Sequence, residues 1–389
     1  MFKVRTYNQI SNKGLSRFDR DRYEIGGELS QPDAFMLRSQ KLHDIEIPES
    51  LVAVARAGAG VNNIPVDKYT AKGIVVFNTP GANANAVKEL VAAGLLLASR
   101  DIFQGMNYVQ SLTGIGSAGE MSALLEKEKK RFAGCELYGK TLGVVGLGAI
   151  GAIVANMALD LGMEVVGYDP AISIEAAWRL SSEVEKMDSL QHLLSRADYV
   201  SLHVPALEAT RHMINAETLK GFKTGAKLLN FAREEIVDTQ ALVQALDAGP
   251  LAAYITDFPT PELLGRDDVL ALPHIGASTE EAEENCAVMA ANQLIAFLED
   301  GSIRNSVNFP STHMARNGGY RLTFSNENVP KVLGNVLTIL ADSNNNVIDL
   351  VNKSRDNIAY NIIDVEDQPT AAIVAAIAAV KGVVSVRLL

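Results

Sequence analysis

The sequence predicts an α/β protein that is followed by a smaller α+β domain. Short apolar or β-branched runs, typical of strands, alternate with Ala- and Leu-rich stretches, typical of helices, before residue 100 and again over residues 141–278. Over residues 321–389 the order changes to strand, helix, strand, strand, helix, strand. At 389 residues the chain is too long for one compact core, so we expect several domains.

The first alternating region begins the chain. Its strand candidates are residues 2–6, 51–56 and 74–77, and the last two each run into a glycine-containing turn. Residues 88–100 are rich in Ala and Leu and are typical of a helix. We therefore expect one α/β layer in this region.

The second alternating region predicts a single doubly wound sheet. Its strand candidates are residues 141–145, 165–168, 199–203, 227–230, 253–257 and 269–272. Helical stretches separate these runs, so the connections can cross over the sheet and the strands can run parallel. A long helical pattern over residues 279–298 follows the last strand.

A polar stretch precedes the tail. It covers residues 301–319, holds Pro310, Gly318 and Gly319, and is typical of a linker. The elements beyond it are expected near residues 321–325, 329–341, 346–352, 358–365, 370–380 and 383–389. Their order is that of a ferredoxin-like, split βαβ domain.

Composition and charge exclude several classes of function. The net charge is -11, whereas a surface for nucleic acid needs clustered Lys and Arg. No apolar run is long enough for a membrane span, and the first residues lack the pattern of a secretion signal. Cys135 and Cys286 are the only cysteines, so we expect neither a disulfide framework nor a zinc cluster. These features predict a cytoplasmic protein with no metal, no nucleic-acid partner and no membrane partner.

The strongest local signal is Gly146-Leu147-Gly148-Ala149-Ile150-Gly151, a GxGxxG motif between a strand candidate and a helical stretch. Such glycines permit a tight turn and let the backbone approach a pyrophosphate, while the helix N-terminus offers free N–H groups. Asp169 ends the next strand, where its carboxylate can bind the adenosine ribose and repel a 2′-phosphate. The motif therefore predicts NAD as the cofactor, and the alternative is a glycine turn in an ordinary sheet.

Four further motifs follow the order found in a known enzyme family. They are Arg56-Ala57-Gly58-Ala59-Gly60-Val61, Asn230-Phe231-Ala232-Arg233, Thr256-Asp257-Phe258-Pro259 and Pro273-His274-Ile275-Gly276. Together with the glycine motif they make the chain resemble the D-2-hydroxyacid dehydrogenases. Within that family it resembles a short D-3-phosphoglycerate dehydrogenase with a C-terminal ACT-type domain.

The resemblance implies three domains. A flavodoxin-like substrate-binding domain would comprise residues 1–100 and 284–305. A doubly wound, Rossmann-type NAD-binding domain would comprise residues 101–283. A linker, residues 306–316, would lead to a ferredoxin-like, ACT-type regulatory domain at residues 317–389.

The resemblance also implies three catalytic residues. Arg233 would hold the substrate carboxylate and polarise the oxygen on carbon 2, although Glu234 stands where the family commonly has glycine. His274 would accept the hydroxyl proton. Glu262 would pair with His274 and favour its protonated form, unless a one-residue shift of register puts Pro261 at that position. A surface Arg, a structural His and a surface or helix-capping Glu are the alternatives.

The same resemblance implies the binding residues. Against the cofactor we expect the glycine motif with Asp169, and further His203, Val204, Pro205, Ala232, Asp257 and Gly276. Asp257 would reach the nicotinamide carboxamide, and His203 has a buried structural role as its alternative. Against the substrate we expect Arg56, Ala57, Gly58 and Asn78. The backbone of Ala57 and Gly58 would bind the carboxylate and Arg56 the phosphate, while Arg38 is either a second phosphate contact or a solvent-facing residue.

In the tail, Asn328 and Pro330 match the ACT pattern, whereas Asn326 stands where a His is frequent and Lys331 where a Gly is usual. An amino-acid effector at this domain is therefore left open. The last strand, residues 383–389, is more apolar than one buried face requires. We therefore expect the domain to pair with its twin, in a homodimer or homotetramer.

The implied reaction is the NAD-dependent oxidation of D-3-phosphoglycerate to 3-phosphohydroxypyruvate, the first step of L-serine biosynthesis. A glyoxylate or hydroxypyruvate reductase, or another D-2-hydroxyacid dehydrogenase, is the alternative of the same class, and the ACT-like tail argues against it. A non-catalytic NADH-sensing binding protein is the alternative of another class. The set of Arg233, Glu262 and His274 argues for an enzyme.

Overall fold

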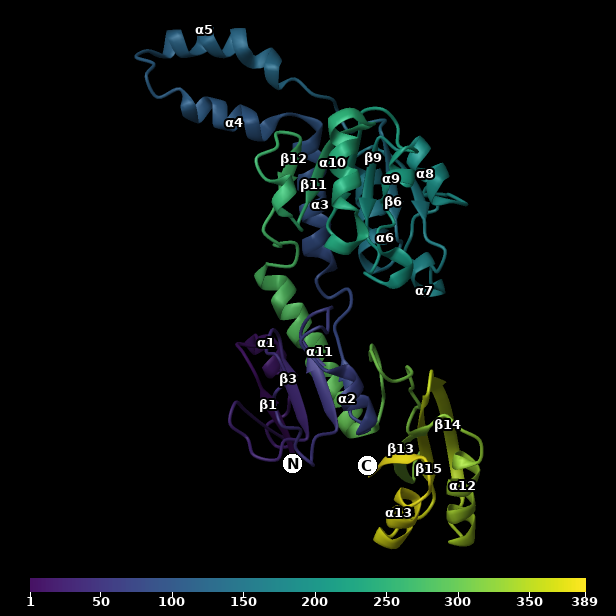
Figure 1. The fold of residues 1–389 in the computed structure, drawn as a ribbon. Coiled ribbons are helices and arrows are strands. Elements are labelled where there is room, and N and C mark those ends of the chain that lie inside the picture. The colour runs from purple at the N-terminus through teal and green to yellow at the C-terminus, as the bar shows by residue number, and fades with distance from the viewer. The chain divides into compact units, whose positions relative to one another are not determined.

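The computed structural model describes residues 1–389 except the side chain of Glu175, and it has a mixed α/β architecture (Figure 1). Its contacts divide the chain into two compact units. The first unit comprises residues 1–83 and 279–389, and the second comprises residues 84–278. The predicted α/β fold class is confirmed. The expected domain boundaries remain a prediction.

A parallel sheet of five strands forms the N-terminal part of the first unit. In sheet order its strands are β2 (Tyr23–Gly26), β1 (Phe2–Thr6), β3 (Ala34–Leu37), β4 (Ala53–Arg56) and β5 (Val75–Phe77). This 2-1-3-4-5 order is that of the flavodoxin-like fold. The strands β3 and β5 are buried at every residue, because both faces of a parallel sheet are covered.

Helices cover the two faces of this sheet. The helices α1 (Asn12–Leu15) and α11 (Glu280–Asp300) pack on one face, where Phe297 of α11 meets Phe77 of β5. The short helix α2 (Val66–Ala71) buries Tyr69 in a separate core with Phe35 and Val76. The sheet is therefore closed by a helix that returns to this unit only after the chain has passed through the second unit.

An antiparallel sheet of four strands forms the C-terminal part of the first unit. In sheet order its strands are β14 (Val347–Arg355), β15 (Ile358–Val365), β13 (Tyr320–Glu327) and β16 (Val383–Leu388). The helices α12 (Val332–Asp342) and α13 (Ala371–Ala378) pack on one face of it, around Phe324, Val336 and Ile363. The predicted ferredoxin-like order of elements is confirmed.

Part of the second face of this sheet, along β13 and β15, is buried as well. Ile358, Tyr360 and Ile362 share an apolar core with Phe297 of α11, and Val384 of β16 packs against that core. The apolar surplus of the last strand, which suggested a twin domain, is thus partly covered within one chain, while Leu388 stays 36% exposed. Pairing through this strand stays a prediction.

Residues 303–314, which overlap the expected linker, pack against the N-terminal sheet. The buried Asn308 accepts the Val76 amide at 2.8 Å and donates to the Ile74 carbonyl at 2.9 Å. Phe309 beside it is 1% exposed. The polar residues that suggested a free linker thus satisfy backbone groups next to β5.

Seven parallel strands form one sheet in the second unit. In sheet order they are β12 (Val269–Ala271), β11 (Leu251–Thr256), β10 (Ala226–Asn230), β9 (Tyr199–Leu202), β6 (Thr141–Val145), β7 (Glu164–Tyr168) and β8 (Glu185–Lys186). The chain order reverses between β6 and β9, as in the Rossmann fold. Ligands of such sheets bind beyond the carboxyl ends of the strands, next to this reversal.

Helices cover both faces of the second sheet. On one face lie α3 (Ala84–Ser99) and α6 (Ala149–Asp160). On the other lie α8 (Leu190–Arg196), α9 (Ala216–Leu219) and α10 (Thr239–Ala248). The shorter elements are α7 (Ile174–Ala177) and the 3-10 turns η2 (Glu208–Thr210), η3 (Glu234–Ile236) and η4 (Pro261–Leu263). The turns η3 and η4 follow β10 and β11, at the carboxyl edge of the sheet.

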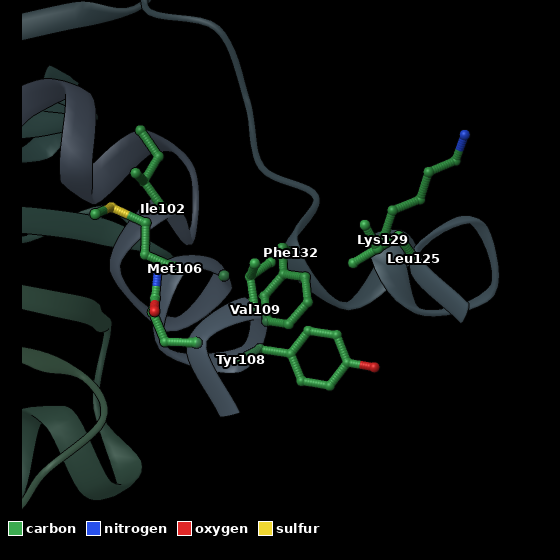
Figure 2. A pocket seen from close by; sticks show the side chains of 9 residues that line it. Ile102, Met106, Tyr108, Val109, Leu125, Lys129 and Phe132 are labelled. Atoms are coloured by element: carbon green, nitrogen blue, oxygen red, sulfur yellow. The ribbon is translucent and has the colours of Figure 1, made fainter. Parts of the chain in front are cut away.

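An arm extends from the second unit (Figure 1). It consists of α4 (Ile102–Ser111), α5 (Ala118–Glu128) and the 3-10 turn η1 (Lys129–Phe132). No residue of α4 or α5 is buried in the structure described here. A largely apolar pocket of about 450 Å³ lies in the arm, where the rings of Tyr108 and Phe132 are 5.4 Å apart (Figure 2). The arm thus presents apolar side chains that no described part of the chain covers.

In the part of the chain that the structure describes, no helix combines the length and apolar character that a membrane span needs. The same residues contain no group of three or more His, Cys, Asp or Glu side chains able to hold a metal ion.

Candidate active site

The glycine motif forms the turn between β6 and α6. Gly146 has φ +88°, and a β-carbon there would lie 2.6 Å from the His203 carbonyl oxygen. At Gly151 a β-carbon would lie 1.8 Å from the Gly146 carbonyl oxygen. At Gly148, by contrast, no described atom beyond its chain neighbours lies within 4 Å of that position. The fold therefore requires the first and third glycines, whereas the second leaves open space before the N-terminus of α6.

Asp169 lies at the same edge of the sheet, directly after β7. Its carboxylate accepts the Leu147 amide at 2.8 Å and the Ala171 amide at 2.9 Å. These two bonds fix a negative charge beside the glycine turn. No side chain caps α6 in the described structure, and its N-terminal N–H groups and positive dipole end suit a phosphate group.

His203, Val204 and Pro205 follow β9 on the other side of the glycine turn. The Nε2 atom of His203 lies 2.8 Å from the Ser201 hydroxyl. Burial lowers the pKa of His203 to about 3, so its imidazole is neutral at neutral pH. The residue shapes the turn through its backbone, because its carbonyl lies against Gly146.

Arg233 follows β10 in a loop that Asn230 holds. The fully buried Asn230 side chain donates to the Arg233 carbonyl at 2.9 Å and accepts the Ala232 amide at 3.1 Å. Arg233 is exposed, and its guanidinium donates to the Ala232 carbonyl at 2.6 Å. Glu234, in place of the usual glycine, begins the turn η3. The loop therefore carries an exposed guanidinium, and the buried Asn230 side chain fixes the backbone of the loop by hydrogen bonds.

His274 lies in the turn after β12, and Asp257 holds that turn from the end of β11. Asp257 is 2% exposed, and its carboxylate accepts the Ile275 amide at 2.8 Å and the Gly276 amide at 2.7 Å. His274 has φ +56°, which is uncommon for a residue with a side chain. Its ring packs against Phe258, with 4.7 Å between the ring centroids. The contact of Asp257 with this turn was not predicted from the sequence, and its contact with nicotinamide stays a prediction.

Glu262 is exposed on η4, and no hydrogen bond joins it to His274 among the described residues. Its own backbone amide lowers the pKa of its carboxyl group. The expected pair of Glu262 and His274 is therefore not formed in this structure, and Phe258 is the neighbour of the imidazole instead. Phe258 directly follows Asp257, but the sequence gives no sign that their loop meets the turn of His274.

In the first unit, Arg56 ends β4 and holds the loop that follows. Its guanidinium donates to the Arg38 carbonyl at 2.9 Å and to the Gly60 carbonyl. The Asn78 side chain donates to the Ala59 carbonyl at 2.6 Å. Both residues therefore fix the loop, and their contact with a substrate stays a prediction.

Ala57 and Gly58 lie within this loop, the first buried and the second half-buried. Beside it, Arg38 forms an ion pair with Glu283 of α11 at 2.6 Å, and both side chains are almost half exposed. Arg38 is therefore paired with a carboxylate on α11, which the sequence did not indicate.

The comparisons with known proteins agree with the fold and the motifs. Residues 93–276 match the family described as D-isomer specific 2-hydroxyacid dehydrogenase, NAD binding domain. The D-3-phosphoglycerate dehydrogenase of Haemophilus influenzae is 33% identical over 357 residues, covering 89% of this chain and 83% of that protein. The enzymes of the same name from Methanocaldococcus jannaschii and Synechocystis are 37% and 38% identical, and the matches cover 79% and 74% of this chain. The matches cover 56% and 50% of those two proteins, so the chain spans about half of their length.

Solved structures are similar as well. The crystal structure of the TT0316 protein from Thermus thermophilus has a TM-score of 0.62 and 29% identity, covering 79% of this chain and 100% of that one. An NAD⁺-bound 3-phosphoglycerate dehydrogenase from Entamoeba histolytica has a TM-score of 0.61 and 26% identity, covering 79% and 98%.

Proposed function

Because the chain belongs to the D-isomer-specific 2-hydroxyacid dehydrogenase family, we propose that it oxidises D-3-phosphoglycerate to 3-phosphohydroxypyruvate with NAD. The relative from Haemophilus influenzae, matched over most of both lengths, bears the name of that activity. The observation that carries the proposal is that Arg233, His274 and the glycine turn follow strands of one parallel sheet and share its carboxyl edge. The reaction would begin the synthesis of L-serine.

The second unit fits NAD in two respects. The open space at Gly148 leaves room for a pyrophosphate before the N-terminus of α6. Asp169 is fixed where an adenosine ribose would bind, and its charge disfavours the extra phosphate of NADP. When bound, NAD would supply the acceptor for the hydride that leaves carbon 2 of the substrate.

The protein's own residues handle the proton and the charges. His274 takes the proton of the substrate hydroxyl, because a neutral imidazole nitrogen can act as a general base. Arg233 binds the carboxylate and polarises the oxygen on carbon 2 through charge-assisted hydrogen bonds. The loop of Ala57 and Gly58 binds the carboxylate, Arg56 serves the phosphate end, and Glu262 is the proposed partner of the protonated imidazole.

Purified protein mixed with NAD and a panel of 2-hydroxy acids tests this proposal, with NADH absorbance as the signal. D-3-phosphoglycerate is expected to give the highest kcat/KM. A preference for an unphosphorylated acid, or faster reduction of glyoxylate or hydroxypyruvate, would instead identify another member of the family. Tight NADH binding without turnover of any acid would favour a sensor.

We also propose that the protein is a cytoplasmic homodimer or homotetramer in which a second copy covers the arm of α4 and α5. Short helices are marginal in water unless an apolar face is packed. Phe103, Met106 and Val109 are 52%, 62% and 43% exposed and recur every three residues along α4. Identical arms can bury such faces reciprocally about a two-fold axis. Light scattering of Met106→Glu tests this, and an unchanged assembly size would exclude the arm as the interface.

An amino-acid effector at the C-terminal domain would find few side chains free to form hydrogen bonds with it. The Asn326 side chain accepts from Asn361 at 2.7 Å and donates to the Glu327 carbonyl at 2.6 Å, so both of its ends are in use. Asn328 is exposed and donates to the Asp356 carbonyl at 3.1 Å. We therefore propose weak serine sensitivity or none, which a serine titration of the dehydrogenase assay measures.

A further inference from the structure

Two buried polar residues on adjacent strands hold the two loops that carry Arg233 and His274. Asn230 is the last residue of β10, and Asp257 directly follows the last residue of β11. Their exposed fractions are 0% and 2%. Fully buried Asn and Asp side chains are uncommon, and they are tolerated when hydrogen bonds satisfy their polar atoms.

The Asn230 amide is satisfied in a way that fixes one loop. Its nitrogen donates to the Arg233 carbonyl at 2.9 Å and to the Tyr254 hydroxyl at 3.2 Å. Its oxygen accepts the Ala232 amide at 3.1 Å. The nitrogen and the oxygen of the amide thus bind successive residues of the Arg233 loop. An apolar side chain at this position could form neither hydrogen bond.

The Asp257 carboxylate is satisfied in a way that fixes the other loop. Each of its oxygens accepts one backbone amide, from Ile275 and from Gly276. The left-handed backbone of His274 is unfavourable for a residue with a β-carbon, and such conformations persist only where the surroundings hold them. The two charge-assisted hydrogen bonds directly after His274 supply that restraint.

The two residues are also joined to each other. The Asp257 amide donates to the Asn230 carbonyl at 3.2 Å, and the Thr256 hydroxyl donates to the same carbonyl at 3.2 Å. Asn230 is paired with Thr256 in the register of β10 and β11. The register of the two strands therefore fixes the spacing between the two holding points.

We propose that Asn230 and Asp257 are positioning residues that set the Arg233 guanidinium and the His274 imidazole at a fixed spacing for the reaction. The proposal rests on the function proposed above, in which Arg233 binds the carboxylate and His274 takes the proton. Reacting groups tolerate little misplacement, and about 1 Å can cost on the order of 100-fold in rate.

The experiment compares Asp257→Asn with Asn230→Ala in steady-state kinetics and in amide hydrogen exchange. Asp257→Asn turns one acceptor into an N–H donor that faces a backbone N–H, so it displaces the His274 turn. We expect kcat to fall by roughly 10- to 100-fold with a small change in substrate KM. Asn230→Ala frees the Arg233 loop, so we expect mainly a higher substrate KM.

The matched control is Asp198→Asn. Asp198 accepts the Thr141 amide at 2.9 Å at the opposite, amino end of the sheet. This change makes the same chemical substitution at an acceptor of a backbone amide, and it also removes the ion pair of Asp198 with Lys223. We expect kcat and KM to stay within about twofold, since neither contact touches the loops of Arg233 and His274.

Hydrogen exchange tests, without any substrate, whether Asp257 holds the turn that contains His274. The amides of Ile275 and Gly276 are expected to lose protection in Asp257→Asn and to keep it in Asp198→Asn. If the wild type turns over no 2-hydroxy acid, the proposed function fails, while this readout still tests the holding contact.

Two results would overturn the proposal. One is unchanged protection of both amides in Asp257→Asn. The other is a loss of activity that lies wholly in NADH affinity, which would make Asp257 a cofactor contact only. Should Asp257→Asn not fold, Gly276→Ala replaces it, because a β-carbon there would lie 3.0 Å from a carboxylate oxygen of Asp257.

Discussion

Arg321 and Asp364 form an ion pair in which both side chains are 0% exposed, with Nε and Oδ1 2.7 Å apart. The same guanidinium donates to the carbonyls of Asp300, Met314 and Ala315. The pair therefore fastens the C-terminal sheet to the end of α11 and to the segment that leads away from it.

Arg321→Met is expected to lower the free energy of unfolding by about 3–5 kcal/mol, because it leaves the Asp364 carboxylate buried without its partner. Urea denaturation measures this loss. The double variant Arg321→Met, Asp364→Leu should recover most of it, since no lone charge remains buried. Lys220→Met, which breaks an exposed pair with Glu217, should cost about 1 kcal/mol or less. An equally small loss for Arg321→Met would contradict the prediction.

Lys331→Gly is expected to stabilise the protein by about 1 kcal/mol. Lys331 stands at the N-cap of α12 with φ +78°, a backbone that glycine adopts without the steric cost of a β-carbon. Thermal unfolding measures the gain. Lys331→Ala is the control, because it removes the charge and keeps the β-carbon. Equal Tm values for the two variants would show that charge, rather than backbone strain, matters here.

The protein is expected to become less stable as the pH is lowered, and the buried His203 is expected to cause part of this loss. Burial lowers the pKa of His203 to about 3, whereas an unfolded histidine titrates near 6.5. Between these values the unfolded chain binds more protons than the folded chain, so stability is lost as the pH falls below about 6.5.

By pH 5 this contribution amounts to about 2 kcal/mol. The free energy of unfolding, measured by urea denaturation at pH 7 and at pH 5, should therefore decrease less in His203→Gln than in the wild type. The difference between the two decreases should be about 2 kcal/mol. His192→Gln, at an exposed histidine, should keep the wild-type dependence. A wild-type slope in His203→Gln would mean that other groups cause the loss.

Asp169→Ala is expected to narrow the preference for NAD over NADP, because the carboxylate that would repel a 2′-phosphate is removed. It should also weaken NAD binding, since the Leu147 amide loses its acceptor in the glycine turn. The ratio of kcat/KM values for the two cofactors measures the first effect. Glu164→Ala removes an equal charge at the other end of β7 and should leave the ratio unchanged. A wild type that uses both cofactors equally would refute the assignment.

His274→Ala is expected to lower kcat by roughly 10²–10⁴-fold, the usual contribution of a positioned general base. NADH affinity should stay nearly unchanged. Glu262→Gln should shift the pH profile of kcat/KM if Glu262 meets the imidazole during turnover. An unshifted profile would agree with the separation of the two side chains in this structure and leave Glu262 without a catalytic role.

Features that depend on near neighbours in the chain could be predicted from the sequence alone. The strand Thr141–Val145 is a short β-branched and apolar run that stops at a glycine, and the structure has the same bounds. Gly146 has a left-handed φ of +88°, and Gly151 lies against the Gly146 carbonyl in the same turn, so a six-residue motif was sufficient to place them. The order of elements along the chain was likewise sufficient for the doubly wound and ferredoxin-like folds.

Contacts between segments that are distant in the chain became visible only in the folded protein. Asp257 holds the turn of His274 because two loops after β11 and β12 converge, and the absent bond to Glu262 has the same origin. Part of the second face of the C-terminal sheet packs against α11, which no pattern in residues 383–389 could reveal. Alternation and composition indicate that a side chain is buried, but they do not identify the segment against which it packs. That segment depends on how whole helix and sheet faces pack together.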